Sequence, residues 1–311
     1  MEITLNRPEF ALIDWIRQRV VDRDPVTIGI GDDAAALRSA TGRDCLIATD
    51  MLMEGVDFTF PPATAALAGR KSLAVNLSDI AAMGGRPTAA FLSVALPAHR
   101  GISFARDLHA GLLDLADEYS VVLAGGDTNS WDGPLVINVA VVGEPCGQDP
   151  IKRSGARPGD WIFVTGALGG SIHGRHLTFE PRVREAGRLV ELVKPHAMID
   201  ISDGLAADLH HILTASRVGA VLDATAIPIS RDLQIENADE ALRHALSDGE
   251  DFELLLTVSE ADAQRLLSHW NDRTPLASIG RITAERECWL TGTNHGREQL
   301  PPLGWSHPIA D

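Results

Sequence analysis

Acidic side chains follow apolar runs at six places along the chain, each beside a glycine, serine or threonine. These places are Gly31-Asp32-Asp33, Thr49-Asp50, Ser78-Asp79, Gly126-Asp127, Asp200-Ile201-Ser202-Asp203 and Gly249-Glu250-Asp251. The apolar runs are typical of buried strands, and small neighbours let a ligand approach the backbone. Carboxylate oxygens are the ligands that hard divalent cations prefer. If the fold gathers these segments, they predict a site with several metal ions for an anionic substrate.

Each of these motifs also has an ordinary structural explanation. Asp32, Ser202 or Asp203 could cap the N-terminus of a helix, and the Gly166–Ser171 stretch suits a strand-to-helix turn as well as a phosphate cradle. By contrast, Asp200 and Asp203 at the start of a helix would place a metal ion beside a phosphate. The residues taken singly leave these alternatives open.

Several other kinds of site are disfavoured by missing patterns. The sequence has no G-x-x-x-x-G-K-[ST] motif, no protein-kinase H-R-D and D-F-G set, and no H-E-x-x-H. Its three cysteines, Cys45, Cys146 and Cys288, lack metal-ligand spacing. A P-loop nucleotidase, a protein kinase and a cysteine-based zinc site are therefore not expected.

The composition is that of an acidic, globular protein. In the 311 residues, 27 basic and 43 acidic side chains give a net charge of −16. This charge excludes nucleic-acid binding through a general basic field. No apolar run approaches the roughly 18 residues that a membrane span needs, and Met1 to Pro8 lacks a signal-peptide pattern. We expect no membrane contact and a cytoplasmic location.

The predicted elements explain how the acidic residues would be positioned. A helix is predicted over 65–83, and one of its faces would carry Ser72, Asn76 and Asp79 beside an apolar stripe. Other helices are predicted at 8–20 and 103–119, with strands at 46–49, 88–96, 121–124 and 135–142. This mixture favours an α+β domain over residues 1–143. A linker rich in Gly and Pro then leads to a second domain, 144–311, whose tail from Gly292 is predicted to be a loop.

Taken in order, the motifs resemble the thiamine-monophosphate kinase family, within the superfamily that includes aminoimidazole ribonucleotide synthetase. The matching stretches are GIGDD at 29–33, TDML at 49–52, KSLAVNLSD at 71–79, GGDT at 125–128, RSGARPGD at 153–160, ISDGL at 201–205 and GEDFEL at 249–254. GWSH at 304–307 resembles the family's C-terminal aromatic segment. The ordered set covers nearly the whole chain and is far more specific than any one motif.

The resemblance implies a two-domain fold: an N-terminal α+β domain that dimerises through its sheet, and a C-terminal α/β domain that completes an active-site cleft. It implies transfer of phosphate from ATP to thiamine monophosphate with several Mg²⁺ ions. The implied metal ligands are Asp33, Thr49, Asp50, Asp79, Asp127, Asp200 and Asp203. The implied ATP contacts are Gly126, Asp127, Arg153 and Ser202, and the implied thiamine phosphate contacts are Asp57, Glu250 and Trp305.

The implied chemistry agrees with the residue types. A phosphate monoester has its second pKa near ~6 and is mostly dianionic at neutral pH, so we expect no catalytic base, and the acids serve as metal ligands that offset the repulsion between two polyanions. One departure is Asp57, which stands where the family usually has histidine. The alternatives are a non-catalytic paralogue that binds ATP and metal, and another ATP-dependent enzyme of the superfamily.

Overall fold

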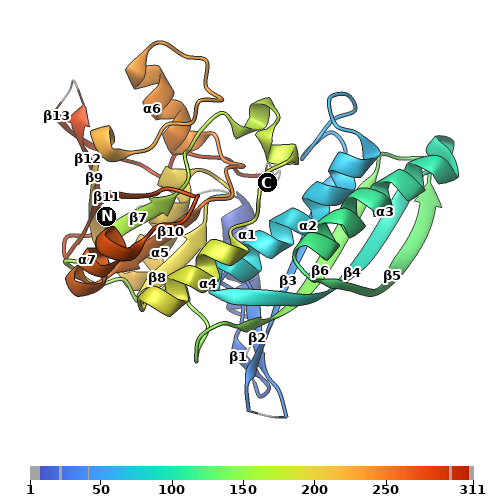
Figure 1. Cartoon of the computed structure of the whole chain (residues 1–311), viewed down its shortest axis with the longest axis horizontal. Coiled ribbons are helices and arrows are strands. Elements are labelled where there is room, and N and C mark those ends of the chain that lie inside the picture. The colour runs from blue at the N-terminus through green and yellow to red at the C-terminus, as the bar shows by residue number, and fades with distance from the viewer. Residues whose placement is uncertain (1–7, 21–22, 41, 294–295, 308–311) are drawn as a thin grey trace.

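The computed structural model describes residues 8–20, 23–40, 42–293 and 296–307. Two β-sheets, one from each half of the chain, dominate the structure, and helices lie between and around them (Figure 1). Among the described helices, none is both long and apolar enough to cross a membrane. The boundary predicted between residues 143 and 144 lies within a strand of the first sheet and stays a prediction.

The first sheet has six strands in the order β1-β2-β3-β6-β4-β5. Their bounds are β1 (Val26–Ile28), β2 (Ala35–Arg38), β3 (Asp44–Met53), β4 (Gly85–Pro97), β5 (Val122–Trp131) and β6 (Val136–Pro145). Neighbours pair antiparallel except β4 and β5, which are parallel. A parallel pair requires a crossover, and the chain supplies it with η1 (Ala98–Arg100) and α3 (Gly101–Glu118).

Two of the acidic motifs lie within strands instead of at their ends, contrary to the expectation. Asp50 pairs with Val139 in the interior of β3, and Asp127 pairs with Ser93 in the interior of β5. Gly126 has φ +154°, and a side chain there would collide with the backbone of Leu92, beside an irregularity in the β4–β5 register. Because Gly126 has no side chain, β5 can pass close to the backbone of β4 and continue as a strand through Gly125 and Gly126, the glycines that suggested a turn.

The second sheet has seven strands in the order β13-β12-β9-β11-β7-β10-β8. Their bounds are β7 (Trp161–Thr165), β8 (Ala197–Asp200), β9 (Gly219–Asp223), β10 (Leu254–Val258), β11 (Leu276–Thr283), β12 (Cys288–Thr293) and β13 (Gly296–Gln299). Neighbours pair antiparallel except β12 and β9. The expectation of a loop from Gly292 is wrong, because β13 pairs with β12.

Helices bury both faces of the second sheet. Phe163 packs in a core with residues of α4 (Val183–Leu192) and α7 (Glu260–His269). Its neighbours Ile162 and Val164 pack with α5 (Leu205–Ser216) and α6 (Ala238–Ser247) on the other face. Burial on both faces explains why these strands are continuously apolar in sequence. The short helices η2 (Ser171–His173), η3 (Arg175–Leu177) and η4 (Ala224–Ala226) lie in the connections.

Helix α2 (Ala65–Ala82) joins the two halves. It begins after Thr64, whose hydroxyl accepts a hydrogen bond of 3.2 Å from the amide of Leu67. It packs on β3 and β6 of the first sheet and on β8 and α4 of the second half, and it is buried over most of its surface (Figure 1). Both the apolar and the polar face of this helix are therefore inside the protein.

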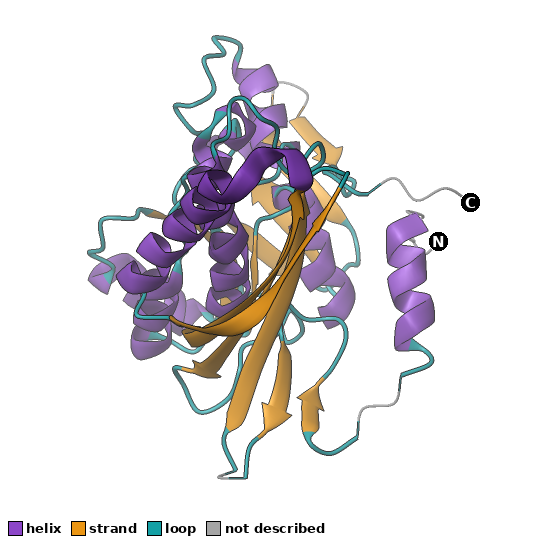
Figure 2. Cartoon of the chain, turned by 90° about the vertical axis from the view of Figure 1, so that its right-hand side faces the viewer, coloured by secondary structure: helices purple, strands orange, loops and turns teal. Residues whose placement is uncertain are grey.

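Helix α1 (Pro8–Arg17) lies to one side, close to the C-terminal segment (Figure 2). The carboxylate of Glu9 accepts a hydrogen bond of 2.8 Å from the amide of His307. The guanidinium of Arg17 lies over Gly31, where a side chain would meet it at 3.0 Å. Helix α1 therefore contacts both the C-terminal segment, through Glu9, and the first acidic motif, through Arg17.

Candidate active site

A cavity of about 410 Å³ opens between the two halves of the molecule, and seven of its sixteen lining residues are acidic. The first half contributes Asp50 from β3, Asp57 from the turn after it, and Asp79 from α2. The second half contributes Asp200, Ser202, Asp203, Glu250 and Trp305. The fold thus gathers eight of the predicted site residues around one space.

Three carboxylates beside the cavity are crowded together. Asp33, Asp79 and Asp200 each place an oxygen within 4.8 Å of the others. Burial raises the pKa of Asp79 well above its usual value, and the nearby charges of Asp50 and Asp200 raise it further. Burial and the charge of Asp33 raise the pKa of Asp200 to about 7, although Ser78 donates a hydrogen bond of 2.5 Å to it.

This cluster fits hard divalent cations. Carboxylates so close and so buried repel one another unless cations neutralise them, and the donor set is made of oxygens, as Mg²⁺ requires. Asn76, which shares a face of α2 with Asp79, also has a buried Oδ1 with no hydrogen-bond partner. The residues present are therefore suited to Mg²⁺.

Arg153 connects the first acidic motif to the second half of the chain. Its Nη2 and Nε lie 2.9 and 3.3 Å from the two carboxylate oxygens of Asp33, and its amide donates a 2.7 Å hydrogen bond to Asp32. Charge-assisted pairs of this geometry are among the strongest in proteins. No helix follows Asp32, because the chain enters β2, so the helix-cap explanation does not apply there.

Asp208 is a buried residue that the sequence did not single out. Its Oδ2 accepts hydrogen bonds of 3.1 Å from the amides of Asp203 and Gly204, and it lies with Asp203 and His211 in a second acidic group. Gly204 precedes α5 without a side-chain cap, so neither Ser202 nor Asp203 is the N-cap of this helix. An acid in the first helical turn was the available signal for Asp208.

The lining of the cavity also includes Glu250, Asp57 and Trp305. Lys71 Nζ lies 2.6 Å from Glu250 Oε2. Burial alone would raise the pKa of Glu250, but the neighbouring His176 and the charge of Lys71 outweigh it and lower that pKa. Asp57 Oδ2 accepts a 2.6 Å hydrogen bond from the amide of Met53, which fixes the turn after β3. Trp305 is 54% exposed, and its indole is available to stack on a ligand.

A strained segment carries Glu250. Glu250 and Phe252 have φ of +60° and +50°, a conformation that residues other than glycine adopt only when their surroundings enforce it. The amides of both donate 2.7 Å hydrogen bonds, to the carbonyls of Ser202 and Ile201. The ring of Phe252 also stacks on Phe179 at 4.1 Å between centroids.

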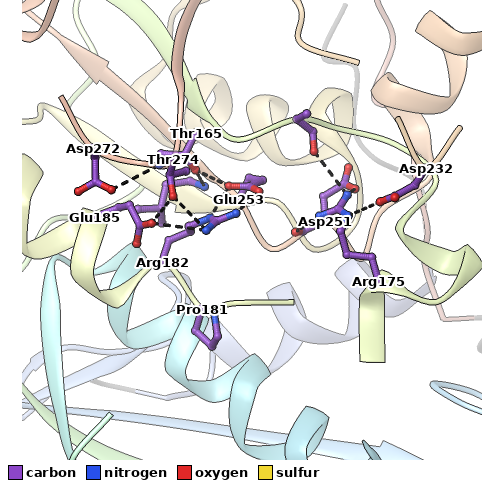
Figure 3. A network of polar contacts seen from close by, with 12 residues as sticks. Thr165, Arg175, Pro181, Arg182, Glu185, Asp232, Asp251, Glu253, Asp272 and Thr274 are labelled. Atoms are coloured by element: carbon purple, nitrogen blue, oxygen red, sulfur yellow. Dashed lines mark hydrogen bonds and ion pairs between the residues drawn. The ribbon is translucent and has the colours of Figure 1, made fainter. Parts of the chain in front are cut away.

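Two arginines from the connection between β7 and α4 hold the same segment (Figure 3). Arg175 donates a 2.8 Å hydrogen bond to Asp251 and one of 2.7 Å to Asp232. Arg182 makes two hydrogen bonds of 2.6 Å with the carboxylate of Glu253, and Thr165 donates a third, of 2.7 Å. The carboxylates on either side of Phe252 therefore anchor the backbone that presents Glu250 to the cavity.

Five predicted site residues do not line this cavity. Asp33 and Arg153 lie next to it, because Asp33 belongs to the carboxylate cluster and Arg153 pairs with Asp33, whereas Thr49, Gly126 and Asp127 lie elsewhere on the first sheet. Thr49 is exposed on the face of the first sheet opposite Asp50, and its hydroxyl accepts a 3.1 Å hydrogen bond from Asn138. Gly126 and Asp127 are exposed on the edge strand β5. Asp127 shares a cross-strand row with Ser93, Asn138 and Met51, which places it three strand spacings, roughly 14 Å, from β3.

Comparison with known proteins decides the family. A model for the N-terminal domain of AIR synthase related proteins matches residues 31–144, and the model for their C-terminal domain matches residues 157–291. The thiamine-monophosphate kinase of Rhodopirellula baltica is 38% identical over 97% of this chain and 98% of its own length. The chain belongs to the thiamine-monophosphate kinase family. The Escherichia coli K12 member is 38% identical over 91% of this chain and 93% of its own length.

Solved structures of this family share the fold. A structure described as "AaThiL complexed with AMPPCP and TMP" has a TM-score of 0.82 and 29% identity, and the match covers 96% of both chains. The thiamine-monophosphate kinase of Stenotrophomonas maltophilia has a TM-score of 0.72 and 36% identity, covering 92% of this chain and 97% of that one. The predicted combination of an α+β and an α/β domain is confirmed, and so is the prediction that the chain is a kinase.

Proposed function

We propose that this kinase transfers the γ-phosphoryl group of ATP to thiamine monophosphate and releases thiamine diphosphate and ADP. The observation that carries the proposal is the composition of the cavity. Crowded carboxylates border the same space as Glu250 and the aromatic Trp305. The family members named above are thiamine-monophosphate kinases, and one neighbouring structure is described as a complex with AMPPCP and TMP.

In the proposed site, Asp33, Asp50, Asp79, Asp200 and Asp203 hold several Mg²⁺ ions. Bound magnesium neutralises the two polyanions and aligns donor and acceptor for in-line displacement. Arg153 and Ser202 contact ATP, while Asp57, Glu250 and Trp305 contact the thiamine moiety or its phosphate. The acceptor phosphate is already ionised at neutral pH, so the chain needs no general base.

The test compares two acceptors. With ATP and Mg²⁺, thiamine monophosphate should yield one thiamine diphosphate for each ADP, whereas unphosphorylated thiamine should yield no phosphorylated product. Chromatography with fluorescence detection of the thiamine esters measures both. ATP binding without thiamine diphosphate would favour a non-catalytic paralogue, and ADP formed with a different acceptor would favour another enzyme of the superfamily.

We also propose that the chain forms a homodimer through the open face of its first sheet. Helices α2 and α3 pack on the opposite face. The open face carries Phe91 and Val122, which are 43% and 64% exposed. Large apolar side chains exposed together are unusual on a surface that faces solvent. In a two-fold pairing, each copy would cover this surface of the other.

Such a dimer would explain the position of Asp127. Its side chain projects from the open face at the sheet edge, too far from Asp50 for one Mg²⁺ ion, whose ligand distances are about 2.1 Å, to contact both within one chain. From a second copy, Asp127 and Gly126 can approach the cavity across the interface. We therefore propose that these two residues serve the partner's site.

Subunit exchange tests this arrangement. Asp127→Asn and Asp200→Asn homodimers should each be inactive, but an equal mixture should regain up to about a quarter of wild-type activity, because each heterodimer then contains one intact site. Steady-state assays before and after mixing measure the gain, and light scattering reports the dimer. If mixing restores nothing although heterodimers form, Asp127 does not act across the interface.

A further inference from the structure

Lys71 is a fully buried cation that contacts two residues of the cavity lining, Asp57 and Glu250. Its side chain has 0% exposure, and it lies on α2, two turns before Asp79. A buried lysine carries a large desolvation cost, and a buried ion pair is weak evidence for stability because apolar residues often serve as well. A lysine at this position therefore calls for an explanation beyond packing.

The contacts of Lys71 join the two halves of the molecule. Its Nζ donates a 2.8 Å hydrogen bond to the carbonyl of Asp57 in the first half. In the second half, it lies 3.1 Å from His176 Nδ1 and 2.6 Å from Glu250 Oε2. The same ammonium thus fixes the turn that carries Asp57 and the carboxylate of Glu250.

The contact between Lys71 and Glu250 is an ion pair. Glu250 Oε2 is buried and lacks a partner with hydrogen-bond geometry, although the ammonium is in ion-pair contact with it. Removal of Lys71 would leave this oxygen buried and uncompensated, with the His176 imidazole, at 3.7 Å, as its remaining polar neighbour. Glu250 itself is 26% exposed and lines the cavity, so the rest of its carboxylate can meet a ligand.

We propose that Lys71 is a positioning residue, which orients Glu250 and holds its carboxylate ready for the cationic thiamine moiety of the acceptor. This inference rests on the proposed function. Lys71 acts through Glu250 and touches no reacting atom, and neither Lys71 nor Glu250 belongs to the carboxylate cluster that would hold magnesium. Its loss should therefore weaken acceptor binding and leave the phosphoryl transfer step nearly intact.

A double-mutant cycle tests the proposal. Lys71→Met should raise KM for thiamine monophosphate at least tenfold and change kcat less than threefold. In a Glu250→Gln background, the same substitution should change KM less than twofold, because the group through which Lys71 acts is already absent. Lys194→Met, a change of an exposed lysine, is the matched control and should change neither constant.

Two results would overturn the proposal: an equal rise in KM in both backgrounds, or a loss confined to kcat. If Lys71→Met does not fold, His176→Gln in the same cycle should also raise KM only where Glu250 is present. Calorimetric binding of thiamine monophosphate without ATP repeats the comparison independently of turnover. A wild-type protein that binds the acceptor but makes no thiamine diphosphate would contradict the proposed function while leaving this cycle measurable.

Discussion

Asp200→Asn should abolish thiamine diphosphate formation and also make the metal-free protein more stable. Asp200 is 3% exposed and lies at the centre of the carboxylate cluster, within 4.8 Å of Asp33 and Asp79. Loss of one metal ligand should lower kcat by ~10³-fold or more, because magnesium carries the charge stabilisation in phosphoryl transfer. Without metal, the Asp200 carboxylate only repels the neighbouring carboxylates, so replacing it with a neutral amide should stabilise the fold. The wild-type protein would keep this destabilising charge because the activity requires it.

The stability effect has a defined dependence on pH. The folded protein holds a proton on Asp200 up to about pH 7, whereas the unfolded chain releases it near the ordinary pKa of 3.8. The penalty from Asp200 therefore grows as pH rises through this window and is complete above it. In EDTA, Asp200→Asn should raise the melting temperature clearly at pH 8 and little at pH 4.5.

Asp114→Asn is the matched control, since Asp114 is exposed on α3 and belongs to none of the acidic motifs. It should change neither kcat nor the melting temperature. Calorimetry in EDTA measures the melting temperature of each variant, and the product assay measures its kcat. Near-normal turnover of the Asp200→Asn variant would remove Asp200 from the metal site, and a lower melting temperature at pH 8 would contradict the repulsion.

Arg182→Met should cause the largest loss of stability. Glu253 is 2% exposed and its carboxylate is paired by two 2.6 Å hydrogen bonds with Arg182, as Figure 3 shows. Breaking a buried pair by removing one partner costs about 3–5 kcal/mol, because the other charge stays buried. Urea denaturation should report a decrease of this size in the free energy of unfolding.

Arg184→Met provides the control, two residues away. Arg184 and Glu118 form a pair whose side chains are 67% and 44% exposed, so its loss should cost about 0–1 kcal/mol. KM for thiamine monophosphate should rise only in the Arg182 variant, since Glu253 anchors the strained segment that carries Glu250. Equal destabilisation by the two substitutions would show that the buried Arg182–Glu253 pair contributes no more to the free energy of unfolding than the exposed pair.

The sequence predicted the elements whose residues repeat with a clear period. The helix predicted over 65–83 is α2, because its N-cap Thr64 and the glycines after it mark both ends. Periodicity and capping residues do not tell how far apart two residues on different strands lie. Asp127 appeared to belong with Asp50, yet the two lie on different strands and opposite sheet faces, and only the strand order reveals it.

The buried support of the site could not be predicted from spacing either. Lys71 is a single basic residue on a helix. The turn after β3 brings Asp57 to it within the first half, and the packing of the two halves brings Glu250. Asp57 was notable only as a departure from the family's histidine, whereas its carboxylate fixes the turn after β3. Such roles depend on side-chain contacts between segments that are far apart in the chain.

The dependence of turnover on free Mg²⁺ tests the central claim most directly. With ATP and thiamine monophosphate saturating, the rate of thiamine diphosphate formation should keep rising after all ATP is present as its magnesium complex, because the carboxylate cluster must bind further ions. EDTA should reduce the rate to zero, and added Mg²⁺ should restore it. A rate that already saturates with the magnesium–ATP complex alone, or that persists in EDTA, would contradict a site in which the clustered carboxylates hold several catalytic ions.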